Sequence, residues 1–144
     1  MTDQMAYALV FVLLVVSAFS SACETAFLSV SKARLHQRAR LGEKKAMLTL
    51  KLVGQPEQML TTLLLINTLV NSASSSIITA LLVEKFGEVG VLYATVVVSA
   101  TLLVLCEALP KSFGARFTES ISLACAPIFL ALIHVCMPVV WVVK

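Results

Sequence analysis

The hydrophobic positions of the chain fall into four long runs that carry almost no charge. Each run contains at most one Asp, Glu, Lys, Arg or His, and the runs are residues 5–30, 59–83, 91–109 and 120–143. A helix of roughly 20 apolar residues crosses the hydrocarbon core of a bilayer. The pattern therefore predicts an all-α integral membrane protein in which at least three of the four runs span the bilayer.

The fourth run leaves two interpretations open. It is long enough to span, but Pro127 and Pro138 interrupt it. A proline inside a helix removes one hydrogen bond and clashes with the preceding turn. The run is therefore either a fourth span or a bent hydrophobic helix that lies along the membrane boundary.

Composition supports the membrane assignment and argues against an enzyme. Of the 144 residues 59% are hydrophobic and 13% are charged, and the mean hydropathy is +0.96. A soluble domain usually carries about 25% charged residues. The sequence has no nucleophile–base pair and no catalytic metal motif, so we expect no catalytic and no cofactor-binding residues. The four cysteines have no metal-ligand spacing and are expected to be small buried residues.

The basic residues are concentrated between the first two runs. Seven of the eleven Lys and Arg residues lie within residues 31–54. Positive charge in short loops marks the cytoplasmic side of a membrane protein, which places the N-terminus outside. Beside membrane spans, such a stretch favours contact with anionic lipid headgroups, or a solvated cytoplasmic face, over nucleic acid. We therefore expect membrane lipid, and no nucleic acid, as a partner.

Residues 31–54 are predicted to form two short amphipathic helices at the membrane face. Ser31 is a helix cap, Gly42 separates the two helices, and Gly54 with Pro56 ends one element and begins the next.

Polar residues inside the runs are the candidates for function, because they are costly in hydrocarbon. Ser17, Ser21 and Glu24 share one face of the first predicted helix at i, i+4 and i+7. Asn67 and Asn71 share a face of the second. Two amides on neighbouring turns need partners in hydrocarbon, which favours a function for them over simple helix packing.

The third run contributes a carboxylate next to a proline. Pro110 has no N–H, so the carbonyl of Cys106, four residues back, loses its helical donor beside Glu107. Broken helices with free carbonyls bind cations in transporters. The alternative is a proline kink in which Glu107 pairs with Lys111.

These groups together form a set of oxygen ligands from three helices. Carboxylate, amide, hydroxyl and carbonyl oxygens are the ligands that hard divalent cations prefer, Mg²⁺ above all. No sulfur or imidazole is positioned to favour zinc or copper. A single carboxylate with neutral oxygens holds such an ion loosely enough to release it, as transport requires.

Three segments of the sequence resemble motifs of the CNNM/CorC (CorB) family of magnesium transporters. They occur in the family's order and are Ser21-Ala22-Cys23-Glu24-Thr25-Ala26, Asn67-Thr68-Leu69-Val70-Asn71 and Glu107-Ala108-Leu109-Pro110-Lys111. The sequence departs from the family at Ala22, where the motif has glycine, and at Cys106, where many members have glycine.

The resemblance implies a CNNM-type transmembrane domain over residues 1–144. Its spanning helices would cover about 5–30, 59–83 and 90–112, its short cytoplasmic helices 31–54, and a juxtamembrane belt helix 119–144 with a cytoplasmic C-terminus. The family is a homodimer of the plasma (inner) membrane. Its full-length members continue into cystathionine-beta-synthase domains that bind ATP, so we expect this chain to be the membrane part of a longer protein.

The resemblance also implies a ligand set and a reaction. Carried over onto this sequence, the metal ligands are Ser21, Asn67, Asn71 and Glu107, with Ser17, Glu24 and the Cys106 backbone as second choices. The implied function is Mg²⁺ export, with Na⁺ entry as the proposed coupling.

Two rival functions stay open at this stage. The first is a small cation or drug–proton antiporter that uses Glu24 and needs aromatic walls, for which the sequence near Glu24 offers Phe19 and Phe27. The second is a membrane anchor or sensor for a cytoplasmic domain outside this chain.

Overall fold

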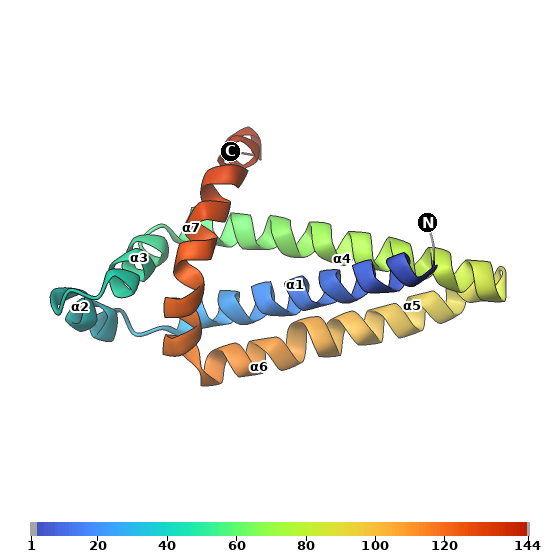
Figure 1. Ribbon diagram of the computed structural model, residues 1–144, viewed down its shortest axis with the longest axis horizontal. Helices are drawn as coiled ribbons and strands as arrows, with labels where there is room; N and C mark the ends of the chain where they lie inside the picture. Colours follow the sequence, from blue (N-terminus) through green and yellow to red (C-terminus); the bar gives the residue numbers. More distant parts are fainter. Residues whose placement is uncertain (1–2, 144) are drawn as a thin grey trace. The chain divides into compact units, whose positions relative to one another are not determined.

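The computed structural model describes the backbone of residues 3–143 and the side chains of residues 4–135, and this part of the chain is helical with no strand (Figure 1). The fold is the all-α membrane class that the sequence predicts. Cys136 and Pro138 lie outside the described side chains. The elements are α1 (Asp3–Ser29), α2 (Lys32–Arg40), α3 (Lys44–Val53), α4 (Pro56–Phe86), α5 (Val89–Thr101), the π-helical segment η1 (Leu102–Ala108), α6 (Leu109–Arg116) and α7 (Thr118–Val143).

Four helical stretches of the described chain are long and apolar enough to cross a membrane. They are Gln4–Ser29, Pro56–Phe86, Val89–Arg116 and Thr118–Val135. The chain is therefore an integral membrane protein. The fourth stretch belongs to α7, which runs through Pro127 as one helix, so this proline does not end it.

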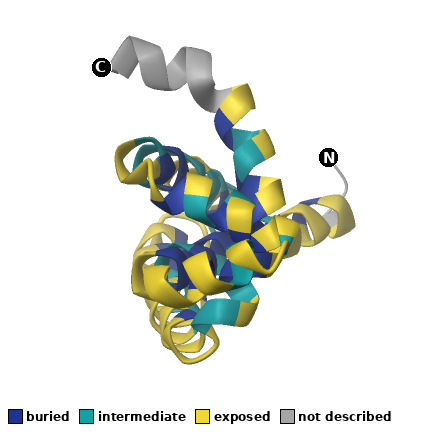
Figure 2. Cartoon of the chain, turned by 90° about the vertical axis from the view of Figure 1, so that its left-hand side faces the viewer, coloured by how far each residue is buried: buried dark blue, intermediate teal, exposed yellow. Residues whose placement is uncertain are grey.

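Most of the apolar surface of these helices is exposed. Figure 2 shows how widely exposed positions cover the helices. The share of the most apolar window that is buried is 33% in the first stretch but 6% in Pro56–Phe86. Such bare apolar surface is expected where lipid or another membrane helix replaces water as the neighbour.

The chain divides into two compact units, which are described one at a time. Unit 1 comprises residues 1–21 and 66–110, and unit 2 comprises residues 22–65 and 111–144.

Unit 1 is built from α5, η1 and the adjoining parts of α1 and α4, which run alongside one another (Figure 1). The thiol of Cys106 donates to the Leu14 carbonyl at 3.7 Å and so links η1 to α1. At the other end Lys85 donates to the Tyr7 hydroxyl at 2.7 Å. Gly87, with φ +63°, makes the turn between α4 and α5, a backbone conformation that other residues rarely adopt.

Unit 2 contains the basic helical hairpin α2–α3. As predicted, Ser31 caps α2 by accepting from the Arg34 N–H at 3.5 Å, and Gly42 turns the chain with φ +87°. Arg38 donates to Glu119 at 2.8 Å and to Glu43 at 2.6 Å. These two carboxylates, Glu119 first, raise the pKa of Arg38 above its ordinary value, because they stabilise the charged form.

The core of unit 2 lies around the last turns of α1. Phe27 is 1% exposed, and its ring meets that of Phe129 edge-on at 5.6 Å. The Cys23 thiol donates to the Cys125 sulfur at 2.7 Å, and both are buried, as expected for these cysteines. Contacts of this kind hold the end of α1 against α7.

Helix α6 also packs closely on α1. A Cβ atom added to Gly114 would lie 2.3 Å from the carbonyl oxygen of Ala22. No side chain fits into such a gap, so the glycine is what allows the two backbones to approach.

Candidate metal-ion site

Of the predicted site residues of unit 1, the structure brings Asn71 and Cys106 into contact with Ser17. This residue is 1% exposed, and its hydroxyl donates to the Asn71 Oδ1 atom at 2.6 Å, joining α1 to α4. The same hydroxyl interacts with the thiol of Cys106 on η1. Ser17 was predicted only as a second-choice ligand, yet its side chain contacts residues of both α4 and η1.

Asn67 lies one helical turn before Asn71 on the same face of α4. Its Oδ1 atom is buried, and no donor reaches it among the described residues. A buried amide oxygen without a donor costs about 1–3 kcal/mol. Such an acceptor indicates a place where a cation or an ordered water completes the coordination.

The serines of α1 add hydroxyls to the same part of unit 1. Ser21, one turn after Ser17, is 1% exposed. Ser20 is 2% exposed, and its hydroxyl has no hydrogen-bond partner within the described structure. Ser20 was not among the predicted site residues, although its i+3 spacing from Ser17 was a usable signal. By contrast, Ser74 donates to the Val70 carbonyl of its own helix at 2.8 Å.

In the π-helical segment η1, some backbone carbonyl oxygens have no helical hydrogen-bond donor. In a π-helix each N–H bonds five residues back, and here Leu109 bonds to the carbonyl of Val104. α-Helical bonding resumes with α6, and Pro110 has no N–H. The carbonyls of residues 105–107 therefore share one helical donor, Lys111, which leaves two of the three without one.

The sequence predicted fewer free carbonyl groups in this segment than the structure has. It assumed α-helical spacing and so named the carbonyl of Cys106 alone. The π register was not foreseen, because π-helices are rare and have no clear sequence signature. Short π-helical segments inside α-helices are frequently found at functional sites.

Glu107 lies within this distorted segment, and its side chain is exposed. The described part of the structure contains no ion pair between Glu107 and Lys111, the alternative considered above. It also contains no hydrogen bond that the amide of Asn67 or Asn71 donates to Glu107. The carboxylate is thus available to a ligand, but the structure does not itself join it to Asn67 or Asn71.

Two further observations define the donor set. Glu24, predicted as a second-choice ligand, is half-buried and belongs to unit 2. Among the described residues no three His, Cys, Asp or Glu side chains gather as metal ligands. The cluster in unit 1 offers hydroxyl, amide and carbonyl oxygens, and the same unit carries the exposed carboxylate of Glu107; these are the ligand types that a hard cation prefers.

Comparison with protein families gives a match over most of the chain. Residues 8–144 match the family described as the cyclin M transmembrane N-terminal domain, CNNM.

Individual proteins from bacteria and a plant are also similar. A UPF0053 protein of Haemophilus influenzae is 33% identical over 96% of this chain, and the UPF0053 inner membrane protein YfjD of Escherichia coli is 30% identical over 90% of it. A chloroplastic DUF21 domain-containing protein of Arabidopsis thaliana is 31% identical over 77% of the chain. The aligned region covers 33%, 30% and 17% of these relatives' own lengths, so the chain spans about a third or less of each.

Proposed function

Because the chain belongs to the CNNM family of transmembrane domains, we propose that it moves Mg²⁺ across the membrane through the oxygen cluster of unit 1. The observation that carries the proposal is the buried Oδ1 atom of Asn67, which lacks a donor one turn from the Ser17–Asn71 pair. An oxygen kept free at this depth is useful to a cation that has lost water.

Each ligand type has a distinct role in this mechanism. The amides of Asn67 and Asn71 and the hydroxyl of Ser21 replace water oxygens, as the free carbonyls of η1 also can. Glu107 compensates the charge of the ion. Because one carboxylate neutralises only half of a divalent charge, the ion stays loosely held, and a transporter needs a site that releases its cargo.

The proposal is tested by calorimetric titration of Mg²⁺ into the purified protein and a Glu107→Ala variant. We expect the variant to bind at least about tenfold more weakly, the loss of one strong charge interaction. Glu88→Ala is the matched control, since Glu88 is an exposed acid of the same unit, in the α4–α5 connection, and its loss should leave the affinity unchanged. Equal affinities of wild type and Glu107→Ala would remove Glu107 from the site.

The direction of transport and its coupling are further parts of the proposal. We expect Mg²⁺ to leave the cell in exchange for Na⁺. Mg²⁺ flux from liposomes, measured with and without a Na⁺ gradient, tests both. A flux that does not respond to the gradient would contradict the coupling, and a flux that Glu107→Ala leaves unchanged would contradict the site.

Orientation and assembly complete the proposal. The basic hairpin α2–α3 supports a cytoplasmic position for this segment, with the N-terminus outside and the C-terminus inside. Under this topology α7 is a belt helix, although its length also allows it to span. The exposed apolar face of Pro56–Phe86 supports a homodimer in the membrane. In the full-length protein, ATP-binding regulatory domains would follow this domain.

The antiporter hypothesis loses support from the position of one aromatic residue. Phe27 would have to line a path for a lipophilic cation, but it is 1% exposed and packed on Phe129. The anchor or sensor hypothesis predicts no Mg²⁺ flux from liposomes that contain either this chain or the full-length protein.

A further inference from the structure

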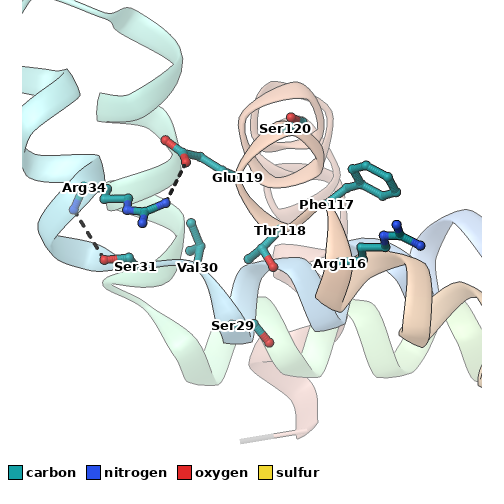
Figure 3. Close-up of a pocket in the computed structure, with 9 residues that line it drawn as sticks. All are labelled: Ser29, Val30, Ser31, Arg34, Arg116, Phe117, Thr118, Glu119 and Ser120. Carbon is teal, nitrogen blue, oxygen red and sulfur yellow. Dashed lines mark hydrogen bonds and ion pairs between the residues drawn. The ribbon is translucent and has the colours of Figure 1, made fainter.

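A cavity of about 350 Å³ lies within unit 2, and none of its lining residues is among those assigned to the transported ion (Figure 3). One wall is formed by residues 29–31 and Arg34, where α1 ends and α2 begins. The other is formed by residues 116–120, where α6 ends and α7 begins. The volume is at the lower end of the roughly 300–1,000 Å³ typical of small-molecule sites, which suits a headgroup-sized ligand.

The walls are polar and carry an excess of positive charge. Two arginines, Arg34 and Arg116, line the cavity together with a single acid, Glu119. Four hydroxyl side chains are spread over both walls: Ser29, Ser31, Thr118 and Ser120. Guanidinium groups and hydroxyls are the side chains that hold phosphate oxygens most effectively.

The two arginines differ in how far they are already engaged. Arg34 forms a long ion pair with Glu119 at 3.6 Å, and Glu119 is held more closely by Arg38 at 2.8 Å. Arg116 has no carboxylate partner among the described residues, and its guanidinium lies 5.7 Å from the centre of the Phe117 ring. An anion that enters the cavity therefore meets one unpaired guanidinium and one that is weakly paired.

Helix ends of both polarities meet around the cavity. Helix α2 starts at Lys32 and α7 at Thr118, both beside the cavity wall. The first N–H groups of a helix have no helical acceptor and carry a partial positive charge. Helices α1 and α6 end beside the same cavity, and their last carbonyl groups carry partial negative charge, so the preference for an anion rests on the arginines.

The surroundings of the cavity indicate where the anion comes from. Its walls begin at the ends of α1 and α6, which close two apolar stretches. Leu28, Phe113 and Phe117 beside it are 58%, 61% and 43% exposed. Apolar side chains next to a basic polar pocket match the arrangement of acyl chains next to a charged headgroup.

We propose that this cavity binds the phosphate group of an anionic phospholipid, with Arg116 and Arg34 as its main ligands. Glu119 competes with the phosphate for Arg34, so its carboxylate weakens binding. Free inorganic phosphate shares the same chemistry but lacks the acyl chains that the neighbouring apolar residues would contact. The proposal does not depend on which ion the membrane domain transports.

The test compares three ligands against the purified full chain, with the thermal midpoint as the measure of binding. The ligands are short-chain phosphatidic acid, phosphatidylcholine with the same acyl chains, and inorganic phosphate. We expect phosphatidic acid to raise the midpoint in a saturable way and the other two to have little effect at equal concentration. Stabilisation by inorganic phosphate that is as strong would overturn the lipid as source, and no stabilisation by either anion would overturn the site.

Two variants with opposite expected effects make the test specific. Arg116→Gln should weaken the apparent affinity for phosphatidic acid by about three- to tenfold, the range expected for one charge-assisted contact. Glu119→Gln should strengthen it, because the competing carboxylate is gone. Lys51→Gln removes one exposed positive charge of α3 that does not line the cavity and is the matched control.

The variants also separate the site from general charge attraction. If Arg116→Gln and Lys51→Gln reduce the affinity equally, the lipid is attracted by the basic surface as a whole and the proposal is wrong. If Arg116→Gln does not fold, Glu119→Gln decides alone, since an unchanged or weaker affinity in that variant contradicts competition at the cavity.

Discussion

The two units of the molecule differ in which of their polar side chains lack a hydrogen-bond partner. In unit 2 most polar groups that leave the surface have partners: Arg38 is held by Glu43 and Glu119, and Thr49 donates to the Lys45 carbonyl at 2.8 Å. In unit 1 the buried oxygen of Asn67 and the hydroxyl of Ser20 have none among the described residues.

Under the proposed function, this difference distinguishes the residues that stabilise the fold from those that bind the ion. Paired polar groups stabilise the fold, whereas a buried polar group without a partner costs stability and is a candidate for contact with a ligand. Thr62 in unit 2 is the exception, since its buried hydroxyl also lacks a partner in the described structure. The comparison predicts that variants in unit 2 change stability and that variants in unit 1 change ion binding.

The largest effect on stability is expected from Phe27→Ala in unit 2. The side chain is buried against Phe129, and replacing a buried Phe with Ala costs about 3–5 kcal/mol through lost contacts and a cavity. Thermal or denaturant unfolding in detergent micelles measures the loss. Leu28→Ala is the control. The Leu28 side chain, next to Phe27 in the sequence, is 58% exposed, so its removal should destabilise the protein far less. Equal losses for the two variants would mean that the aromatic contact does not hold α1 and α7 together.

A smaller loss of stability is expected from Gly114→Ala. The new methyl group would meet the Ala22 carbonyl at 2.3 Å, so α6 and α1 must separate. Overpacking of this kind costs about 1–3 kcal/mol. Unfolding of Ala115→Leu, at the exposed neighbouring position, provides the comparison and should be close to wild type. A Gly114→Ala variant as stable as wild type would show that the close approach of the two backbones is not needed.

The comparison between paired and unpaired oxygens can be tested within unit 1 by two leucine variants. Asn67→Leu removes an oxygen that has no donor, so the free energy of unfolding should not fall, while Mg²⁺ affinity falls about tenfold, or about 1.4 kcal/mol. Asn71→Leu also removes the acceptor of Ser17 and should lower both stability and affinity. Calorimetry and thermal unfolding separate the two outcomes. Equal stability losses in both variants would contradict the assignment of Asn67 as a free ligand.

The sequence was sufficient for the class of fold. Nearly uncharged runs predicted that long helices are present, and Ser31 and Gly42 predicted the cap and turn of α2–α3, because these features depend on local chemistry. The same spacing rules placed Ser17 and Ser21 on one face of α1, and Asn67 and Asn71 on one face of α4. Packing between distant segments decides which helix faces meet. The sequence could therefore predict that polar side chains of α1 and α4 interact, but not that Ser17 bonds to Asn71.

Two features of the site needed the structure. The π-helix η1 changes which carbonyl groups lose their hydrogen-bond donors. The shift from bonding four residues back to five residues back cannot be recognised in the hydrophobic pattern of the sequence. The exposed position of Glu107 and the pocket at Arg116 depend on how helices end and pack, which the sequence describes only to within a few residues. The motif resemblance named candidate ligands, whereas the structure showed which of their oxygens are unpaired.

The smallest effect is expected from Tyr7→Phe, which tests whether unpaired oxygens or polar contacts in general make unit 1 functional. Lys85 donates to the Tyr7 hydroxyl at 2.7 Å, and its ammonium lies 5.3 Å from the ring centre. Both side chains are exposed, so water replaces the lost hydrogen bond and the stability should change by less than about 1 kcal/mol. The phenylalanine ring keeps the cation–π contact. Mg²⁺ affinity should stay at the wild-type value, because this hydroxyl is paired and lies at the other end of the unit from Ser17. A marked loss of Mg²⁺ binding in Tyr7→Phe would mean that the whole face of unit 1 supports the ion, and not the oxygens around Asn67 alone.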